Sequence, residues 1–437
     1  MKTNKQEQLI TNIREGRYDE RLRFLYPDGS PVQTHRERYC QAISNFVSHF
    51  GNRVVELYSS PGRTEICGNH CDHQNGRVIA ACVSTDILAV ISRRKDSVVR
   101  VYSEGYAPVS VDLSDTRANP EEAGTMAALI RGMAAERKAK ASEEALPGFD
   151  AYLTSRIPSG SGMSSSAAFE MLLEAIFSGR QPSDYPLSKE EVIQAARMGQ
   201  RTENRYFGKP SGLMDQLTCA AGGMLFMDFQ QTDAPEMEPL HADLAGQGYQ
   251  ICLVNTGGSH ADLTEDYASI PRDMKKIAAC FSKQVLRDVP LAQFLDAIPK
   301  LREQAGDRAV LRALHFFEEN ERVVRAKEEL LKDSTDGIQN FIEIVKASGR
   351  SSFQLLQNII PESHPEKQSL ALALAISDRF LTQEGASRVH GGGFAGTIQA
   401  FVPAHLIQSY RETMESVFGP GSVMILPVRP VGPFRLV

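Results

Sequence analysis

PSGSGMSSSAA, residues 158–168, is a run of glycine and serine that leads directly into the segment FEMLLEAIFS. Apolar residues recur at helical spacing over 164–178, which predicts a helix there. Small residues let backbone N–H groups approach an anion closely, and a helix start adds unpaired donors and a positive dipole end. The segment therefore predicts a phosphate-binding loop at a helix start. On spacing alone, a flexible loop closed by an N-cap serine is the alternative.

The serine hydroxyls give this segment further groups that can bind a ligand. Ser164, Ser165 and Ser166 follow one another within one turn, so they can cap the helix, bind phosphate oxygens or reach a metal ion. Two common nucleotide-binding signatures are missing from the sequence, which has neither GxxxxGK[ST] nor a GxGxxG after a strand. The segment still favours a ligand that carries phosphate.

A second stretch, PGRTEICGNHCDHQNG at residues 61–76, concentrates Arg, Asn, His and Asp between glycines. His70 and Asp72 are two residues apart and can bind adjacent hydroxyls of a polyol. Arg63 can neutralise charge that develops on an attacked oxygen. The alternative is a solvated loop with incidental charges.

Two carboxylates and a third glycine-rich segment complete the candidate residues. Glu203 lies at the end of a predicted helix, and Asp215 follows the turn GKPSG. One carboxylate can hold Mg²⁺ while the other accepts a hydroxyl proton, although a lone Asp near a helix start is often a cap. The segment HGGGFAGT at 390–397 permits a close approach of backbone to backbone or to ligand, and a structural turn is its simpler interpretation.

Away from these segments, strand and helix patterns alternate along the chain. Residues 78–92 and 98–103 are rich in β-branched residues and predict a strand pair. Residues 260–382 are mainly helical in pattern. The other predicted elements are a helix at 188–206, strands at 224–229 and 250–255, a strand near 396–402, a helix near 403–417 and a strand near 422–428. This order predicts an α+β fold with two lobes, residues 1–230 and 231–437, divided at the turn-like segment after 230.

Composition excludes several classes of protein. The 437 residues carry 48 Lys and Arg against 54 Asp and Glu, a net charge of −6, which disfavours a general nucleic-acid or anionic-membrane binder. We see no signal peptide or membrane-length apolar run, and we expect a globular cytoplasmic protein. Seven scattered cysteines without a CxxC pair predict neither a disulfide framework nor a zinc site.

Taken in order, these motifs resemble those of the GHMP kinases, and within them the galactokinases. PSGSGMSSSAA is similar to the phosphate-loop motif, GGGFAG to the third motif and PGRTEICGNHCDHQNG to the galactokinase signature. SGLMDQ resembles the catalytic-aspartate segment, and HADLTEDY at 260–267 resembles the stretch that supplies a sugar-contacting tyrosine. The resemblance implies a two-lobed α+β fold with mixed sheets and helices in each lobe, and with the active site between the lobes.

The resemblance also implies roles for single residues. Asp215 would be the base or anchor for the anomeric hydroxyl of a sugar, and Arg63 would stabilise the oxyanion and the moving phosphoryl group. Mg²⁺ would be bound by Ser166 and Glu203. The sugar would contact Asn69, His70, Asp72, Gly212 and Tyr267. The ATP phosphates would be held by Gly160, Ser161, Gly162, Met163, Ser164, Ser165 and Ser166.

The implied activity is direct, in-line phosphorylation of galactose to galactose 1-phosphate by ATP. We expect the protein to bind neither nucleic acid nor membrane and to be a monomer. Asn69 departs from the glutamate usual in galactokinases, as Cys71 and His73 depart from threonine and tyrosine. An asparagine can donate hydrogen bonds, which an ionised glutamate cannot. A kinase of a related sugar, such as N-acetylgalactosamine, arabinose or another hexose, and a non-catalytic sugar sensor are therefore alternatives. The intact stretch from Ser164 to Ala168 favours an enzyme over a sensor.

Overall fold

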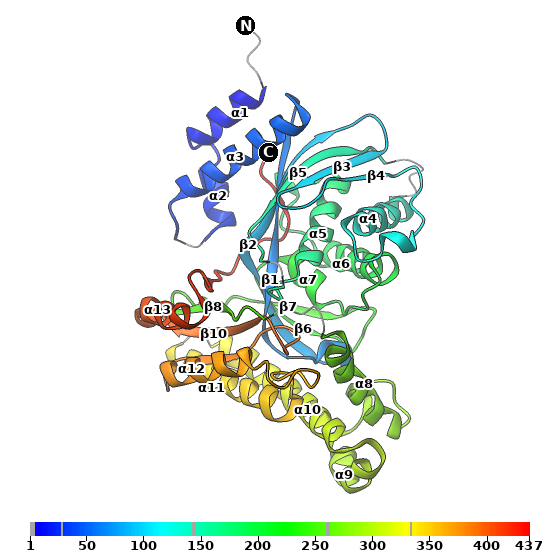
Figure 1. Cartoon of the computed structure of the whole chain (residues 1–437), viewed down its shortest axis with the longest axis vertical. Coiled ribbons are helices and arrows are strands. Elements are labelled where there is room, and N and C mark those ends of the chain that lie inside the picture. The colour runs from blue at the N-terminus through cyan, green and yellow to red at the C-terminus, as the bar shows by residue number, and fades with distance from the viewer. Residues whose placement is uncertain (1–4, 28, 142–145, 159, 259–262, 333) are drawn as a thin grey trace.

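The computed structural model describes residues 5–27, 29–141, 146–158, 160–258, 263–332 and 334–437. In these ranges the strands form an eight-stranded and a four-stranded sheet, and helices pack on both (Figure 1). The strands are β1 (Glu56–Cys67), β2 (Arg77–Arg93), β3 (Val98–Ser103), β4 (Val109–Asp112), β5 (Phe149–Ser155), β6 (Met224–Asp228), β7 (Glu236–Leu240), β8 (Tyr249–Asn255), β9 (Ala386–Val389), β10 (Thr397–Pro403), β11 (Val423–Ile425) and β12 (Phe434–Arg435). The α-helices are α1 (Lys5–Arg14), α2 (Asp19–Leu25), α3 (Val32–Phe50), α4 (Met126–Ala141), α5 (Ser165–Ser178), α6 (Lys189–Thr202), α7 (Met214–Ala221), α8 (Thr264–Cys280), α9 (Leu291–Ala305), α10 (Asp307–Leu330), α11 (Thr335–Ser351), α12 (Ser369–Leu381) and α13 (Ile407–Phe418).

The first sheet is built on β1 and β2, the two long antiparallel strands in the middle of the molecule (Figure 1). Its order is β12-β1-β2-β5-β3-β4, and β6 and β7 extend it alongside β2. The prediction of a strand pair from 78–92 and 98–103 is half wrong. Both segments are strands, but β5 lies between them, antiparallel to β2 and parallel to β3. Local patterns identify strands, whereas their neighbours are chosen by packing between distant segments.

Helices cover both faces of this sheet in the upper part of the molecule as drawn in Figure 1. Along β2, Leu88 and Val90 pack with the N-terminal helices α1 to α3, while Ala89 and Ile91 pack with α4 and α5. This division follows from the two-residue period of a strand, whose successive side chains point to opposite faces. The sheet therefore places α5, and the loop that leads into it, on the face away from the N-terminal helices.

The second sheet has the order β11-β8-β10-β9 and is antiparallel throughout. On one side Ile398 packs with α12 and α13, and on the other Phe401 meets Phe341 of α11 with ring centroids 5.3 Å apart. The predicted helical region 260–382 is confirmed as α8 to α12, and the predicted elements near 396–402, 403–417 and 422–428 are confirmed as β10, α13 and β11. The α+β class with mixed sheets and helices is likewise confirmed.

The two sheets do not divide at a single point of the chain. β7 lies beyond residue 230 and pairs with β6 in the first sheet, and the second sheet begins with β8. At the C-terminus, β12 returns to pair with β1. The first sheet thus draws on both sides of residue 230, and a division into 1–230 and 231–437 stays a prediction.

No helix in the described ranges is long and apolar enough to cross a membrane. The seven cysteines all lie in those ranges and are free, and Cys280 is the exposed one among them. The expectation that they build no disulfide framework therefore agrees with the described structure.

Candidate active site

The predicted phosphate loop leads into α5, so the predicted helix at 164–178 is confirmed to within one residue. Ser164 is the N-cap residue, but its backbone is left-handed, with φ of 52°, and its side chain makes no cap hydrogen bond. Its hydroxyl instead donates to Oδ2 of Asp215 in α7. Ser164 therefore takes the N-cap position without a side-chain cap, and its hydroxyl joins the loop to the predicted catalytic aspartate.

Asp215 lies in the first turn of α7, and Arg63 of β1 neutralises it from the sheet. Arg63 places Nε 2.7 Å from Oδ1 of Asp215, with a second guanidinium nitrogen 2.6 Å away. Burial raises the pKa of the Asp215 carboxyl, but Arg63 and then Lys209 outweigh it, so the pKa is lowered. Asp215 is therefore ionised at neutral pH.

Arg63 also fixes the phosphate loop. Its backbone N–H donates to the carbonyl of Met163 at 3.2 Å, and its guanidinium donates to the carbonyl of Gly162. The register of β1 with β2 shifts between Pro61 and Arg63, where β2 advances by four residues against two in β1. This irregularity of the sheet coincides with the arginine that binds both the loop and Asp215.

The two predicted magnesium ligands lie next to one another. Ser166 donates from Oγ to Oε1 of Glu203 at 2.7 Å. Glu203 begins a π-turn, η4 (Glu203–Phe207), directly after α6, so the predicted helix 188–206 ends in a different local geometry. The same Oε1 accepts from Lys209 Nζ at 2.8 Å, and the Gln216 amide donates to Oε2 at 3.0 Å.

A second buried carboxyl lies behind this pair. Gln216 Nε2 also donates to Oε2 of Glu170 in α5, at 3.0 Å. Burial, and then the charge of Glu203, raises the pKa of Glu170 well above its usual range. Sequence reasoning missed Lys209, Gln216 and Glu170 as members of this cluster. Lys209 and Gln216 flank the SGLMD segment, which is the one signal for them, and Glu170 looks like any core position of α5.

The third glycine-rich segment packs against the phosphate loop. His390 contacts the Ser161 carbonyl through Nδ1 at 3.2 Å and the Thr64 hydroxyl through Nε2 at 3.0 Å. Thr397 donates to the same Ser161 carbonyl at 3.0 Å. Burial lowers the pKa of His390 to about 3, so its ring is neutral. The segment 390–397 thus packs against the phosphate loop through the Ser161 carbonyl, and its interpretation as a structural turn fits these contacts.

Asn69, the predicted sugar contact that departs from the family, is fully buried and held on all sides by protein. Its amide donates to the Gly391 carbonyl at 2.8 Å and to Glu65 at 3.2 Å, while its Oδ1 accepts from Asn358 at 2.9 Å. His70 beside it is partly exposed and contacts the Gly392 carbonyl at 3.0 Å. The structure therefore brings Asn69 to the third glycine segment, and its contact with a sugar stays a prediction.

Asp72 and Gly212 line one cavity of about 700 Å³, together with His73. A Cβ at Gly212 would lie 2.3 Å from Oδ2 of Asp72, so a larger residue there would displace the Asp72 carboxylate. Burial, followed by the charges of Asp215 and Glu65, raises the pKa of Asp72 to about 6. This carboxyl therefore changes charge close to neutral pH.

Tyr267 lies in α8 and donates from its hydroxyl to the Gly393 carbonyl at 2.8 Å. Its ring also meets Phe394 edge-to-face, with centroids 5.5 Å apart. The tyrosine is thus held against the third glycine segment. Residues 260–262 of the predicted segment HADLTEDY lie outside the described residues.

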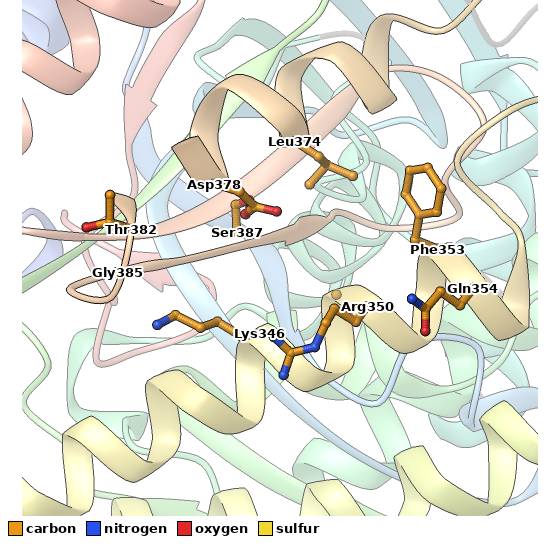
Figure 2. A pocket seen from close by; sticks show the side chains of 10 residues that line it. Lys346, Arg350, Phe353, Gln354, Leu374, Asp378, Thr382, Gly385 and Ser387 are labelled. Atoms are coloured by element: carbon orange, nitrogen blue, oxygen red, sulfur yellow. The ribbon is translucent and has the colours of Figure 1, made fainter. Parts of the chain in front are cut away.

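A separate cavity of about 310 Å³ lies away from these residues, between α11 and α12 (Figure 2). Lys346 and Arg350 line it from α11, Asp378 from α12, and Ser387 from β9. None of the predicted site residues lines this cavity. The candidate active site is therefore the region of α5, α7 and the Asp72 cavity.

Two family models match parts of the chain that carry most of the predicted site residues, but not Tyr267 or the segment 390–397. The GHMP kinases N terminal domain matches residues 128–223, and the galactokinase galactose-binding signature matches residues 44–93. Among solved structures, Lactococcus lactis galactokinase complexed with galactose has a TM-score of 0.73 at 22% identity and covers 91% of this chain and 99% of that chain. A mevalonate kinase has a TM-score of 0.58 at 14% identity and covers 85% of this chain and 98% of its own. The fold and the matched domain define a kinase of the GHMP class.

Sequence relatives indicate which family of GHMP kinases the chain belongs to. A galactokinase of Streptomyces coelicolor is 30% identical over 379 residues, which cover 84% of this chain and 92% of the relative. A galactokinase of Actinobacillus pleuropneumoniae serotype 3 is 29% identical and covers 85% of this chain and 91% of its own length. The chain belongs to the galactokinase family.

Proposed function

We propose that the protein is a sugar 1-kinase, which transfers the γ-phosphoryl group of ATP to the anomeric hydroxyl of galactose and forms galactose 1-phosphate. One observation carries this proposal beyond family membership. The ionised carboxylate of Asp215 is held by Arg63 and by Ser164 at the start of α5, where the phosphate loop ends. An acceptor hydroxyl at Asp215 would thus lie beside the anion-binding helix start.

Asp215 and Arg63 suit the two sides of this reaction. Asp215 is ionised at neutral pH, so it can accept or orient the proton of the attacking hydroxyl. Arg63 is buried beside it and carries a delocalised charge that can neutralise the developing oxyanion. Phosphoryl transfer asks a protein mainly for positioning and electrostatic stabilisation, which this pair supplies. We expect direct in-line transfer without a phosphoenzyme.

The donor side follows from the loop at α5. Residues 160–166 offer backbone N–H groups and hydroxyls to the ATP phosphates at a helix start. Ser166 and Glu203 offer a hydroxyl and a carboxylate oxygen 2.7 Å apart, a donor set that fits Mg²⁺ bound mainly by substrate phosphates. When bound there, Mg²⁺ would neutralise phosphate charge.

The acceptor side is the cavity lined by Asp72 and Gly212, with His70 and Tyr267 held nearby against the third glycine segment. Asp72 can accept hydrogen bonds from sugar hydroxyls, and His70 can donate or accept. Asn69 favours a second candidate function, a kinase of a related sugar. The polar atoms of Asn69 are engaged by Gly391, Glu65 and Asn358. A sugar bound beside Asn69 would therefore meet different hydrogen-bonding groups from those beside a glutamate at this position. A cytoplasmic location and a monomeric state stay predictions.

The test of the function is ATP turnover by the purified protein against galactose, glucose, N-acetylgalactosamine, arabinose and mevalonate. Phosphorus NMR of the product gives the position of the phosphate. We expect galactose to be converted to its 1-phosphate. Turnover of another sugar alone would replace galactose by that sugar, whereas galactose binding without any turnover would indicate a sensor.

Asp215→Asn tests the catalytic assignment. The substitution keeps the shape of the side chain but removes its charge and its basic oxygen, so we expect kcat to fall by roughly 10²–10⁴-fold. Circular dichroism and thermal unfolding check that the fold is retained. Full activity in a folded Asp215→Asn protein would contradict the role of Asp215.

A further inference from the structure

Lys209 lies in the turn that follows η4, and this turn folds it back onto Glu203. Its backbone N–H donates to the Glu203 carbonyl at 3.1 Å, after Gly208, whose φ of 83° reverses the chain. Pro210 follows and restricts the backbone of Lys209. The side chain then places Nζ 2.8 Å from Oε1 of Glu203. Backbone and side chain thus direct the ammonium group to the carboxylate that is expected to face Mg²⁺.

The two partners of this ion pair differ sharply in exposure. The Glu203 side chain is 1% exposed, whereas that of Lys209 is 51% exposed. Among the described residues, Lys209 is the one cation within ion-pair distance of Glu203. The second buried carboxyl, Glu170, accepts from the same Gln216 amide nitrogen as Glu203 does. A buried carboxylate needs a compensating charge, and here the compensation comes from a flexible side chain that reaches in from solvent.

The ammonium group also lies where nucleotide phosphates would bind. Ser166, in the first turn of α5, donates to the same oxygen of Glu203 as Lys209 does. A lysine ammonium group is charged at neutral pH. Lys209 is therefore a cation beside the start of α5.

We infer that Lys209 is a phosphate-binding residue of the nucleotide site, which neutralises Glu203 in the free protein and turns to the ATP phosphates when nucleotide binds. The inference rests on the proposed function for the identity of the nucleotide. A metal cation held by Glu203 would repel the ammonium group, and the phosphate oxygens would attract it. Lysine binds phosphate as a compact point charge, and its four-carbon stem allows this movement.

The test measures binding of ATP by calorimetry in EDTA, so that it depends neither on metal nor on turnover. Lys209→Met should weaken metal-free ATP binding at least tenfold, and Lys209→Arg should restore most of it. Lys332→Met is the matched control, since the Lys332 side chain is also 51% exposed and pairs with a glutamate at 2.6 Å. The control should leave ATP affinity unchanged, and galactose affinity should be unchanged in all three variants.

A second pair of variants separates phosphate binding from a purely structural ion pair. Glu203→Gln should tighten metal-free ATP binding, because it releases Lys209 and removes a negative charge. Adding Lys209→Met to Glu203→Gln should then weaken binding at least tenfold, although no ion pair remains to be broken. This background also covers the case in which Lys209→Met alone leaves Glu203 uncompensated and fails to fold.

Equal metal-free ATP affinity in Glu203→Gln with and without Lys209→Met would overturn the inference. Such a result would leave the kinase proposal intact, because wild-type turnover of sugar is measured separately. Conversely, a wild-type protein that phosphorylates no sugar but shows the expected change in ATP binding would overturn the proposed function and keep the role of Lys209. In steady-state kinetics we expect KM for ATP to rise in Lys209→Met, with KM for the sugar unchanged.

Discussion

Asp72 and Asp215 are two carboxyls of one site whose surroundings move their pKa values in opposite directions. Both are penalised by burial, but Arg63 and Lys209 lower the pKa of Asp215, whereas the charges around Asp72 add to the penalty and raise its pKa to about 6. Pairs of carboxyls with separated pKa values mark a division of roles. Asp215 suits the reacting hydroxyl, and Asp72 suits recognition of the other sugar hydroxyls.

This difference predicts a pH dependence. Asp72 accepts sugar hydrogen bonds when ionised, and a falling pH protonates it near pH 6. We therefore expect kcat/KM for the sugar to fall about tenfold per pH unit below about pH 6, because this parameter reports groups of the free enzyme. Asp72→Asn should lower kcat/KM at pH 8 and flatten the profile between pH 5 and 7. A variant profile with the same inflection near pH 6 would assign that group elsewhere.

Thermal unfolding provides an independent control of the same pKa. The folded protein holds the Asp72 proton more tightly than the unfolded chain, whose aspartate pKa is about 3.9. This contribution to stability is present below about pH 4 and is lost as the pH rises through about 6. The Tm of Asp72→Asn relative to the wild type should therefore increase from pH 4 to pH 7.

At the scale of single elements, α6 is the helix that positions the predicted metal ligand. A capping box holds its start: Ser188 Oγ accepts from the backbone of Glu191 at 3.3 Å, and the Glu191 side chain accepts from the Ser188 N–H at 2.9 Å. Its other end continues into η4, which begins with Glu203. A π-turn changes the direction of successive side chains, and such turns are frequent at functional sites.

Ser188→Ala removes one side of the capping box far from the chemistry. We expect the free energy of unfolding to fall by about 1 kcal/mol, since an unpaired N–H is left at the helix start. Urea denaturation measures this change, and kcat should stay the same. Ser183→Ala is the matched control, because Ser183 is an exposed serine outside α6, and a similar loss there would contradict the capping explanation.

At the scale of the whole molecule, buried polar contacts join the two sheets behind the site. Arg388 of β9 forms an ion pair with Glu65 of β1 at 2.6 Å, and both residues are buried. Asn69 extends this contact to the Gly391 carbonyl and to Asn358, beyond α11. Networks of this kind stabilise one arrangement, because each buried polar group loses its partners if the sheets separate.

Asn69→Ala tests the strength of this connection. The substitution leaves the Gly391 carbonyl and part of Asn358 without their partner, so we expect the free energy of unfolding to fall by about 2–3 kcal/mol. Asn340→Ala, at an exposed asparagine of α11 that contacts Glu329, is the matched control and should change stability by less than about 0.5 kcal/mol. Equal, small losses of unfolding free energy in both variants would show that Asn69 does not stabilise the contact between the sheets.

Many of the helices and strands can be predicted from the sequence, because the patterns that indicate them are local. Helical periodicity identified α5 to within one residue, and β-branched runs identified β2 and β3. The insertion of β5 between β2 and β3 was not predictable in this way, because it depends on contacts between residues far apart in the chain. The same holds for β12, whose two residues carry no pattern and find their place by pairing with β1.

The site, like the fold, was only partly predictable from the sequence. The sequence by itself determined the residue types and their order, including Arg63, Asp215 and Ser166, since glycine-rich loops and charged residues leave motifs. Only the tertiary structure decided which groups meet: Ser164 with Asp215, Asn69 with the third glycine segment, and Lys209 with Glu203. It also decided the ionisation of Asp72, because a pKa depends on burial and on charges that come from distant parts of the chain.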